Sequence, residues 1–153
     1  MAAESHIPAG AGSAHWFAGN LMTLKAPSDA GWTFLEGQLH AGHAPPLHMH
    51  RHEDEAFYLL EGSMRFRCGD DEFDAHAGDF IFVPRGTPHA FRVGSNGART
   101  IQVATADGLA RFIEAAGEPV ERPELPPTDA VDMDRISAIA EQHDMVVVGP
   151  PLA

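Results

Sequence analysis

The chain has 153 residues, of which 44% are hydrophobic and 21% charged, and this composition is typical of one globular domain with a sizeable core. Its formal net charge of −12 would repel a polyanion such as DNA, which excludes nucleic acid as a partner. Cys68 is the single cysteine, so an internal disulfide and a zinc ribbon are excluded. Because no run of about 20 apolar residues and no export signal is present, we expect a cytoplasmic protein with no membrane partner.

Residues 1–14 are rich in Gly and Ala and lack periodicity, which predicts a flexible N-terminal arm. Over residues 15–106, short segments rich in aromatic and β-branched residues alternate with Gly, Pro and Asp. The turn residues in CGDDEF and GSNGAR suit hairpins. We expect about eight strands, at a spacing typical of a sandwich or barrel. The segments are HWFAGNLMTLKA, GWTFLEGQLH, EAFYLLEG, SMRFRC, DEFDAH, DFIFVP, HAFRV and RTIQVAT.

Residues 107–153 have a hydrophobic period of about 3.6, which predicts a helical C-terminal extension packed on the β body. The first helix ends at Gly117, which suits a C-terminal cap. A proline-rich connector follows, and acidic residues begin a second helix over MDRISAIAEQH. The segment MVVVGPPLA closes the chain. The predicted apolar stripes are Leu109, Phe112, Ile113 and Ala116 in the first helix, and Ile136, Ile139, Ala140 and His143 in the second.

The segment HAPPLHMHRHEDEAF concentrates histidines and acids beside a strand that has the pattern of a core strand. Residues i and i+2 of a strand point to the same face and lie about 7 Å apart, so His48 and His50 can bind one metal ion. His52 would lie about 13 Å from His48 on an extended strand, beyond the reach of the same ion. Glu55 has the opposite parity to His50, so a turn or bulge within RHED must return it to the inner face.

A further candidate lies in GDFIFVPRGTPHAF, where two prolines and a glycine form a sharp loop before His89. Phe91 and Val93 share the face of His89 and are apolar. His89 is therefore either a core histidine bonded to the backbone or a metal ligand.

Other polar residues near these segments have a simpler interpretation. We expect His52, Glu53 and Asp54 to form a solvated turn. Cys68 is expected to be a buried hydrophobe and not a nucleophile, because its strand neighbours are apolar.

The spacing of these residues resembles the two motifs of the cupin family. The first motif is Gly, five residues, His-x-His, three or four residues, Glu, six residues, Gly; the second is Gly, five residues, Pro-x-Gly, two residues, His, three residues, Asn. Val93 stands where Asn is usual, at a position that binds no metal in the family. The resemblance is strongest over residues 32–106. The residue pattern of PPLHMHRHEDEAFYLLEG is similar to that of single-domain relatives of quercetin 2,3-dioxygenase. The matching residues are Gly42, His48, His50, Glu55 and Gly62, then Gly78, Pro84, Gly86 and His89.

This resemblance implies an all-β, antiparallel jelly-roll barrel over residues 15–106 with a short helical C-terminal extension. It also implies one six-coordinate divalent transition metal bound by His48, His50, Glu55 and His89, with two positions left for substrate and dioxygen or water. The metal could be Fe, Mn, Ni, Co, Cu or Zn, because three imidazoles and one carboxylate suit each of them. Glu55 is expected to accept a substrate proton as well as bind the metal.

The implied function is that of a metal-dependent dioxygenase, similar to quercetinase, which oxidises a small hydroxylated aromatic or enol-type substrate with O2. Two alternatives stay open: a metal-dependent cupin isomerase, cyclase or lyase, and a non-catalytic cupin that binds a small molecule. The unpaired edge expected for the strand HWFAGNLMTLKA further predicts a homodimer that pairs through this N-terminal strand. The expected substrate wall comprises Phe34, Phe57, Met64, Phe66 and Phe91.

Overall fold

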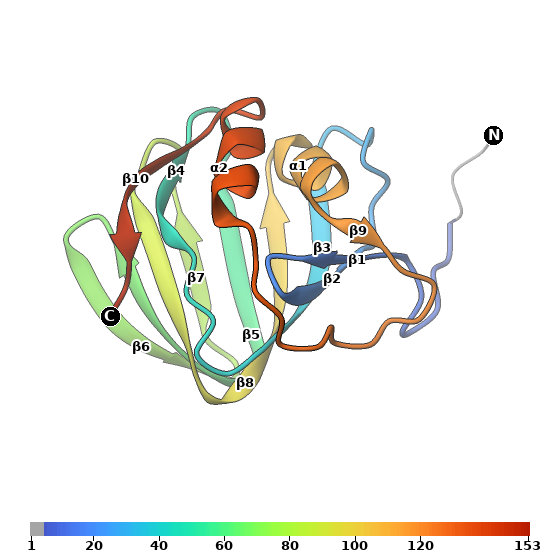
Figure 1. Ribbon diagram of the computed structural model, residues 1–153, viewed down its shortest axis with the longest axis horizontal. Helices are drawn as coiled ribbons and strands as arrows, with labels where there is room; N and C mark the ends of the chain where they lie inside the picture. Colours follow the sequence, from blue (N-terminus) through green and yellow to red (C-terminus); the bar gives the residue numbers. More distant parts are fainter. Residues whose placement is uncertain (1–4) are drawn as a thin grey trace.

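The computed structural model describes residues 5–153, in which two long antiparallel strands run through both halves of a barrel (Figure 1). These are β5 (Glu55–Cys68) and β8 (His89–Ala104). The first half of β5 pairs with the second half of β8, and the second half of β5 with the first half of β8. The two strands therefore bend from one sheet into the other and hold the sheets together.

Each half of this strand pair is extended by shorter strands into a sheet. One sheet has the order β7-β5-β8-β3-β2-β1-β9, and the other β6-β5-β8-β4-β10. The short strands are β1 (Ser13–Phe17), β2 (Asn20–Leu24), β3 (Thr33–Leu39), β4 (Pro46–His50), β6 (Asp71–His76), β7 (Phe80–Val83), β9 (Glu118–Pro119) and β10 (Met145–Pro151). The expected all-β antiparallel barrel with a helical extension is confirmed.

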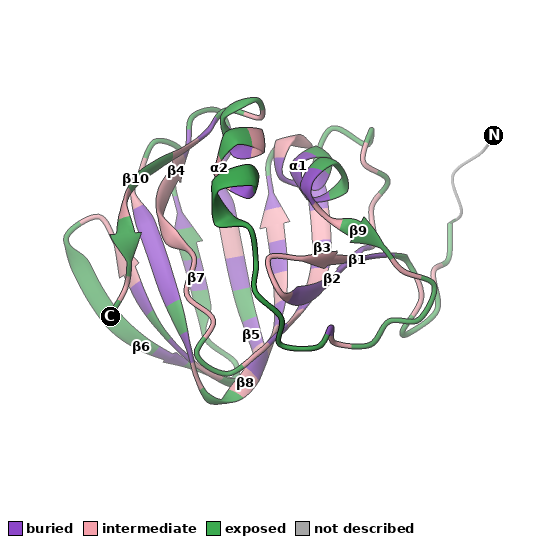
Figure 2. Ribbon diagram, in the orientation of Figure 1, coloured by how far each residue is buried: buried purple, intermediate pink, exposed green. Residues whose placement is uncertain are grey.

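The core lies between the two sheets. It is formed by the alternate side chains of each strand that point to the inner face of its sheet. In β3, buried residues alternate with partly exposed ones along the whole strand, as a sheet with one covered face requires. Leu35, Phe66 and Phe57 are almost fully buried at the centre. Figure 2 shows the inner stretches of the long strands as buried and the outer loops as exposed.

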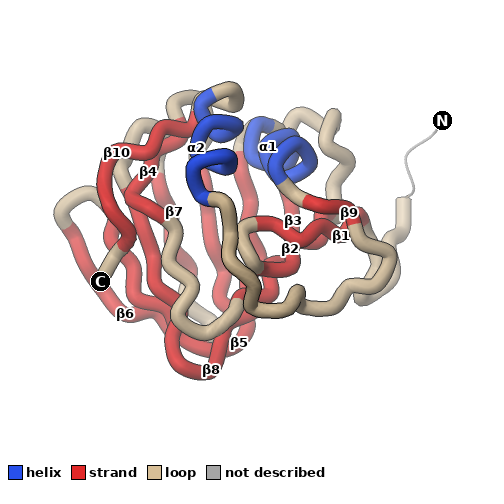
Figure 3. The backbone as a smooth tube through the Cα atoms, viewed as in Figure 1, coloured by secondary structure: helices blue, strands red, loops and turns tan. Residues whose placement is uncertain are grey.

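Helices α1 (Gly108–Ala116) and α2 (Met133–Glu141) cover one end of the barrel side by side (Figure 3). The predicted stripe of α1 is buried, because it faces the barrel. Asp132 caps α2 by accepting a hydrogen bond from the backbone nitrogen of Arg135 at 3.0 Å. Gly117 is the C-cap of α1, as predicted, with a φ of −88°, and its backbone nitrogen donates a hydrogen bond to the Ile113 carbonyl at 2.8 Å. Within the described residues, neither helix is long and apolar enough to cross a membrane.

Three strand predictions need correction. HWFAGNLMTLKA is a hairpin of β1 and β2, because Ala18 and Gly19 both have positive φ, as a tight two-residue turn requires. EAFYLLEG and SMRFRC form one continuous strand, β5. GSNGAR is no hairpin either: β8 continues through it, and the pairing with β5 shifts from Gly62–Ala98 to Met64–Val93, which is a bulge.

The C-terminal segment MVVVGPPLA is an unexpected strand, β10, which pairs with β4. Val147 lies opposite His48, and Met145 lies opposite His50. The chain end therefore supports the strand that carries both histidines.

The N-terminal strand lies differently from the expected dimer edge. β1 begins at Ser13, inside the predicted arm, and its outer edge pairs within the chain: His15 lies opposite Pro119 and Trp16 opposite Glu118 of β9. This edge is thus covered over those residues and is not free to pair with a second copy there. Residues 1–4 of the predicted arm lie outside the described residues.

Candidate metal centre

Four side chains from three strands converge at the helix-covered end of the barrel. His48 and His50 share one face of β4, Glu55 begins β5, and His89 begins β8. The chain leaves the strand conformation at residues 51–54, which turns Glu55 toward the histidines. One ligand atom from each of the four residues lies within 4.8 Å of all the others. The structure therefore brings together all four residues of the sequence-based ligand set.

The three imidazole rings are held with the same nitrogen facing inward. Each Nδ1 lies within hydrogen-bond distance of an oxygen that can only accept, so each Nδ1 carries a hydrogen, and Nε2 is the atom that can bind a metal once it is deprotonated. Such outer partners orient histidine ligands in metal sites. The acceptors are the Pro46 carbonyl for His48 (2.8 Å), the Thr87 carbonyl for His89 (2.9 Å) and Glu53 Oε1 for His50 (2.9 Å).

The inward-facing atoms suit a cation. Glu55 Oε2 lies 3.1 Å from Nε2 of both His50 and His89. The Nε2 atom of His50 is nonetheless buried and has no aligned hydrogen-bond partner in the described part of the chain. Lone pairs on nitrogen and carboxylate oxygen that face one another in a buried site repel unless a positive charge lies between them. Three imidazoles and a carboxylate fit a divalent transition metal in that place.

The electrostatics of the four residues agree with such a site. Burial first, and then the neighbouring His89 and His50, lower the pKa of His48 to about 3, so His48 is neutral. Burial opposes ionisation of Glu55, yet attraction to His50 holds its pKa below the usual range. For His50, burial is outweighed by attraction to Glu55 and by hydrogen bonding to Glu53, which raise the pKa to about 10. A protonated His50 therefore places a positive charge beside Glu55.

Glu53 was expected in a solvated turn, and this expectation is wrong. Its side chain is only 5% exposed, because it is held between His50 and Gly108, the first residue of α1. Its Oε2 atom is buried without a partner in residues 5–153. A carboxylate at this position also interacts favourably with the N-terminal end of the α1 dipole. The only signal in the sequence is the short spacing from His50 to Glu53, across a turn.

The other residues of the turn are placed as expected. His52 is exposed, and the Asp54 carboxylate pairs with Arg85 at 3.1 Å near the surface.

For Cys68, burial first and then Asp71 and Glu55 raise the pKa of the thiol. The thiol therefore stays protonated, which suits a hydrophobe more than a nucleophile.

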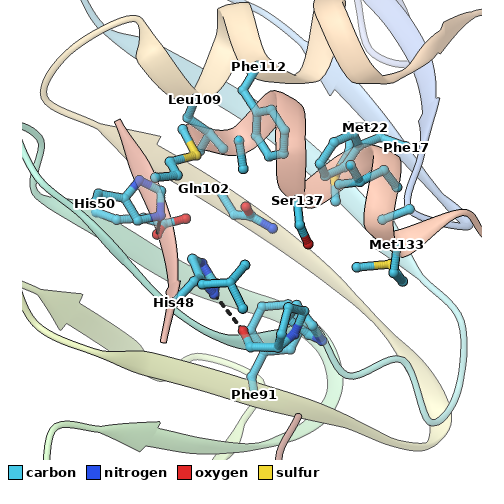
Figure 4. A pocket seen from close by; sticks show the side chains of 18 of the residues that line it. Phe17, Met22, His48, His50, Phe91, Gln102, Leu109, Phe112, Met133 and Ser137 are labelled. Carbon is cyan, nitrogen blue, oxygen red and sulfur yellow. Dashed lines mark hydrogen bonds and ion pairs between the residues drawn. The ribbon is translucent and has the colours of Figure 1, made fainter. Parts of the chain in front are cut away.

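A cavity of about 100 Å³ is lined by His48, His50 and Glu55 of the four-residue cluster (Figure 4). Helices α1 and α2 and strand β10 form much of its wall, which the sequence did not indicate. Its polar lining residues besides the ligand candidates are His43, Gln102 and Ser137, and burial lowers the pKa of His43 to about 4. No lysine or arginine lines it among the described residues. The apolar lining includes Phe17, Met22, Phe57, Phe91, Leu109, Phe112, Met133, Ile136, Met145 and Val147.

Only part of the expected substrate wall reaches this cavity. Phe57 and Phe91 line it. Phe66 lies behind them in the core, with ring centroids 5.2 and 5.6 Å from theirs, and Met64 is buried in the same core. Phe34 has the opposite parity to the buried Leu35, so it points outward against Trp32 and cannot contact a ligand in the cavity. Phe34, Met64 and Phe66 are therefore not part of the wall.

Comparison with known proteins identifies the domain type. Residues 35–102 match the cupin domain family. A curated relative, quercetin 2,3-dioxygenase of Bacillus subtilis, is 28% identical over 107 residues, which are 69% of this chain and 32% of that protein. The chain thus spans about a third of the length of this relative.

Solved structures share the fold at low sequence identity. An RmlC-like cupin from Shewanella frigidimarina superposes with a TM-score of 0.57 at 17% identity, over 77% of this chain and 94% of the other. A mutant of Bacillus subtilis oxalate decarboxylase also gives a TM-score of 0.57, at 21% identity, over 70% of this chain and 31% of the other. The family match over residues 35–102, the relative and the shared architecture agree with the two motifs, and together they support a cupin-superfamily protein.

Proposed function

We propose that the chain is a metal-dependent dioxygenase that oxidises a small hydroxylated aromatic or enol-type substrate with O2. The observation that carries the proposal is the cluster of three inward-facing imidazole nitrogens and one ionised carboxylate at the end of a mainly apolar cavity. The similarity to quercetin 2,3-dioxygenase supports oxygen chemistry. The predicted cytoplasmic location stays a prediction.

The cluster assigns a role to each of its residues. His48, His50, Glu55 and His89 would hold a divalent transition metal, which supplies Lewis acidity and, when redox-active, a route for electrons between substrate and dioxygen. Glu55 Oε2 faces His50 and His89, which leaves Oε1 to accept a proton from a substrate hydroxyl. The lowered pKa of Glu55 makes it a weak base, which favours an acidic hydroxyl such as that of an enol or a phenol as the donor.

The cavity lining limits the substrate further. Without a lysine or arginine in the described lining, no side chain neutralises a substrate carboxylate or phosphate. Gln102 and Ser137 can each form a hydrogen bond to a polar substituent, while Phe57 and Phe91 offer ring contacts and exclude water. In other proteins a cavity of about 150 Å³ takes up benzene. The cavity of about 100 Å³ is smaller than this, so it favours an uncharged molecule of no more than one ring.

The experiment is a turnover assay of iron-, manganese-, nickel- and copper-loaded protein with single-ring enediols, β-diketones and flavonols, in air and under nitrogen. We expect O2 consumption that matches substrate loss in air, and no turnover under nitrogen. Turnover that continues under nitrogen would show an isomerase, cyclase or lyase instead. Tight binding of a panel member without turnover in air would show a binding protein. Glu55→Gln should abolish turnover, because it keeps the size of the side chain and removes both the proton acceptor and the carboxylate of the ligand set.

A further inference from the structure

A glutamine side chain lies among apolar side chains on the inner wall of the barrel. Gln102 of β8 is 5% exposed and lines the cavity. Its cross-strand neighbours are Phe57 of β5 on one side and Leu35 of β3 on the other, and both are almost fully buried. Burial of an amide among apolar groups costs free energy unless its donors and its acceptor are paired. The free polar atoms of Gln102 therefore indicate what this part of the cavity can bind.

The residues around Gln102 fix the orientation of its amide. The Nε2 atom donates a hydrogen bond at 3.3 Å to Oγ1 of Thr100, which lies two residues earlier on the same face of β8. Gly37 of β3 lies opposite Thr100 and leaves room for this pair. A Cβ atom on Gly37 would lie 2.8 Å from Thr100 Oγ1 and 3.2 Å from Gln102 Nε2. Because Nε2 is held by Thr100, the Oε1 atom of Gln102 remains as an acceptor for a group inside the cavity.

Ser137 brings a second uncharged polar group to the same cavity. Figure 4 shows Ser137 and Gln102 at the cavity, the first on α2 and the second on the sheet. Among the described lining residues, Ser137 is the one polar side chain that α2 supplies. Its hydroxyl can donate as well as accept a hydrogen bond. An acceptor on the sheet and a hydroxyl on the helix together suit a ligand group that both donates and accepts, which a hydroxyl does and a methyl or a carbonyl does not.

These two polar groups lie beside the metal centre and not within it. Phe57 follows Glu55 by two residues on β5, and Gln102 lies opposite Phe57, so Gln102 is one row of side chains farther from the helix-covered end than Glu55. Such rows are about 7 Å apart, which is close to the length of one ring with an oxygen atom at each end. A ring ligand with one end at the four-residue cluster can therefore reach Gln102 with a substituent at its other end.

We propose that Gln102 and Ser137 form a hydroxyl-binding subsite that orients a single-ring substrate, in which Gln102 Oε1 accepts from the substrate hydroxyl and Ser137 Oγ donates to it. This subsite rests on the proposed function, since the same cavity would hold the substrate. It narrows the substrate class to a ring with a hydroxyl group on the side remote from the metal centre. A ligand without that hydroxyl leaves the buried amide oxygen unpaired, which lowers affinity by more than the loss of one contact.

The test compares two ligands that differ at one ring position, benzene-1,2,4-triol and 4-methylcatechol. Their binding to the zinc-loaded chain is measured by calorimetry under nitrogen, where zinc undergoes no redox chemistry. We expect the unchanged chain to bind the triol at least about tenfold more tightly than the methyl compound, and Gln102→Leu to reduce this preference to about twofold or less. Gln38→Leu is the matched control and should keep the preference, because Gln38 has the opposite parity to the buried Leu39 and lies on the outer face of β3.

A second variant guards against misfolding of the first. Ser137→Ala removes one hydroxyl from a helix residue and should lower the preference for the triol by about threefold, with unchanged circular dichroism and zinc uptake. Equal affinity of the two ligands for the unchanged chain, or a preference that stays the same in Ser137→Ala or in folded Gln102→Leu, would overturn the subsite. A preference for the triol without O2 consumption by the iron-loaded chain would support the subsite and contradict the proposed oxygen chemistry.

Discussion

His48 and His89 lie directly opposite each other on the neighbouring strands β4 and β8, with ring centroids 4.3 Å apart. This is the single residue pair through which these two strands are registered. The backbone pairing that closes this side of the barrel therefore also sets the distance between two candidate ligands. A shift of either strand by one residue would turn one imidazole to the outer face and open the cluster.

Glu53 is predicted to tune metal binding through His50. Glu53→Gln keeps a hydrogen-bond acceptor for His50 Nδ1 but removes the negative charge, and Glu53→Leu removes both. We expect zinc affinity to fall by about tenfold for the first and about 100-fold for the second, as for other partners of ligating histidines. Competition with a chromogenic chelator measures this loss. Asp54→Asn, next in the chain but paired with Arg85, should bind zinc like the unchanged protein; an equal loss there would show a general effect on the turn.

Gly62 is predicted to be essential for the bend between the sheets. Its φ is +85°, and a Cβ atom would lie 2.1 Å from the Gly97 carbonyl oxygen. Gly62→Ala therefore combines a left-handed backbone with a clash against backbone, and we expect the free energy of unfolding to fall by about 3 kcal/mol or more. Gly78→Ala is the control, because Gly78 has a φ of +92° but open space around it. It should lose only about 1–2 kcal/mol in urea unfolding.

The stability of the metal-free protein should be greatest near pH 6.5. The pKa of His48 is about 3 and that of His43 about 4, below the usual 6.5, so the unfolded chain binds more protons and stability falls as the pH drops below about 6.5. The low pKa of Glu55 adds to this acid loss. The pKa of His50, about 10, has the opposite sign: its contribution is complete below about pH 6.5 and is lost as the pH rises toward 10.

Urea unfolding at pH 5, 6.5 and 9 checks both limbs of this profile. The loss of stability at alkaline pH should disappear in His50→Gln, while the loss of stability at acidic pH should remain. Stability that rises from pH 6.5 to 9 in the unchanged metal-free protein would contradict the proposed charge on His50.

Met133 is predicted to limit the size of the ligand. It lies at the start of α2, is 36% exposed and lines the cavity, so truncation widens the opening at little cost to the core. We expect Met133→Ala to bind a three-ring flavonol about tenfold more tightly, with no change for a one-ring enediol. Val131→Ala is the control, since Val131 is similarly exposed but does not line the cavity. Equal flavonol affinity in all three proteins would show that α2 does not set the limit.

The ligand cluster could be predicted from the sequence because its information is local. The parity of His48 and His50 places both on one face, and the loop of prolines and glycine before His89 marks a chain reversal. The position of Glu53 could not be predicted, since a turn has no periodicity and the contacts that bury this residue come from α1, far along the chain.

The elements that were missed depend on long-range pairing. β10 contains Gly149, Pro150 and Pro151, which disfavour a strand locally, yet it pairs with β4 at the open side of the sheet. We expected Phe34 at the cavity because it is aromatic, but strand parity places it outside, where its ring centroid lies 6.2 Å from that of Trp32. Composition alone cannot separate an inner from an outer apolar residue when both sheet faces are apolar.

The most direct test of the metal centre is a titration of the metal-free protein with zinc and iron(II), followed by calorimetry and elemental analysis. We predict one divalent ion per chain, release of a proton from His50 on binding at pH 7–9, and a loss of affinity greater than about 100-fold in His89→Ala, since outer partners alone cost 10–100-fold. His52→Ala should bind like the unchanged chain. Unchanged affinity in a folded His89→Ala variant would contradict the account.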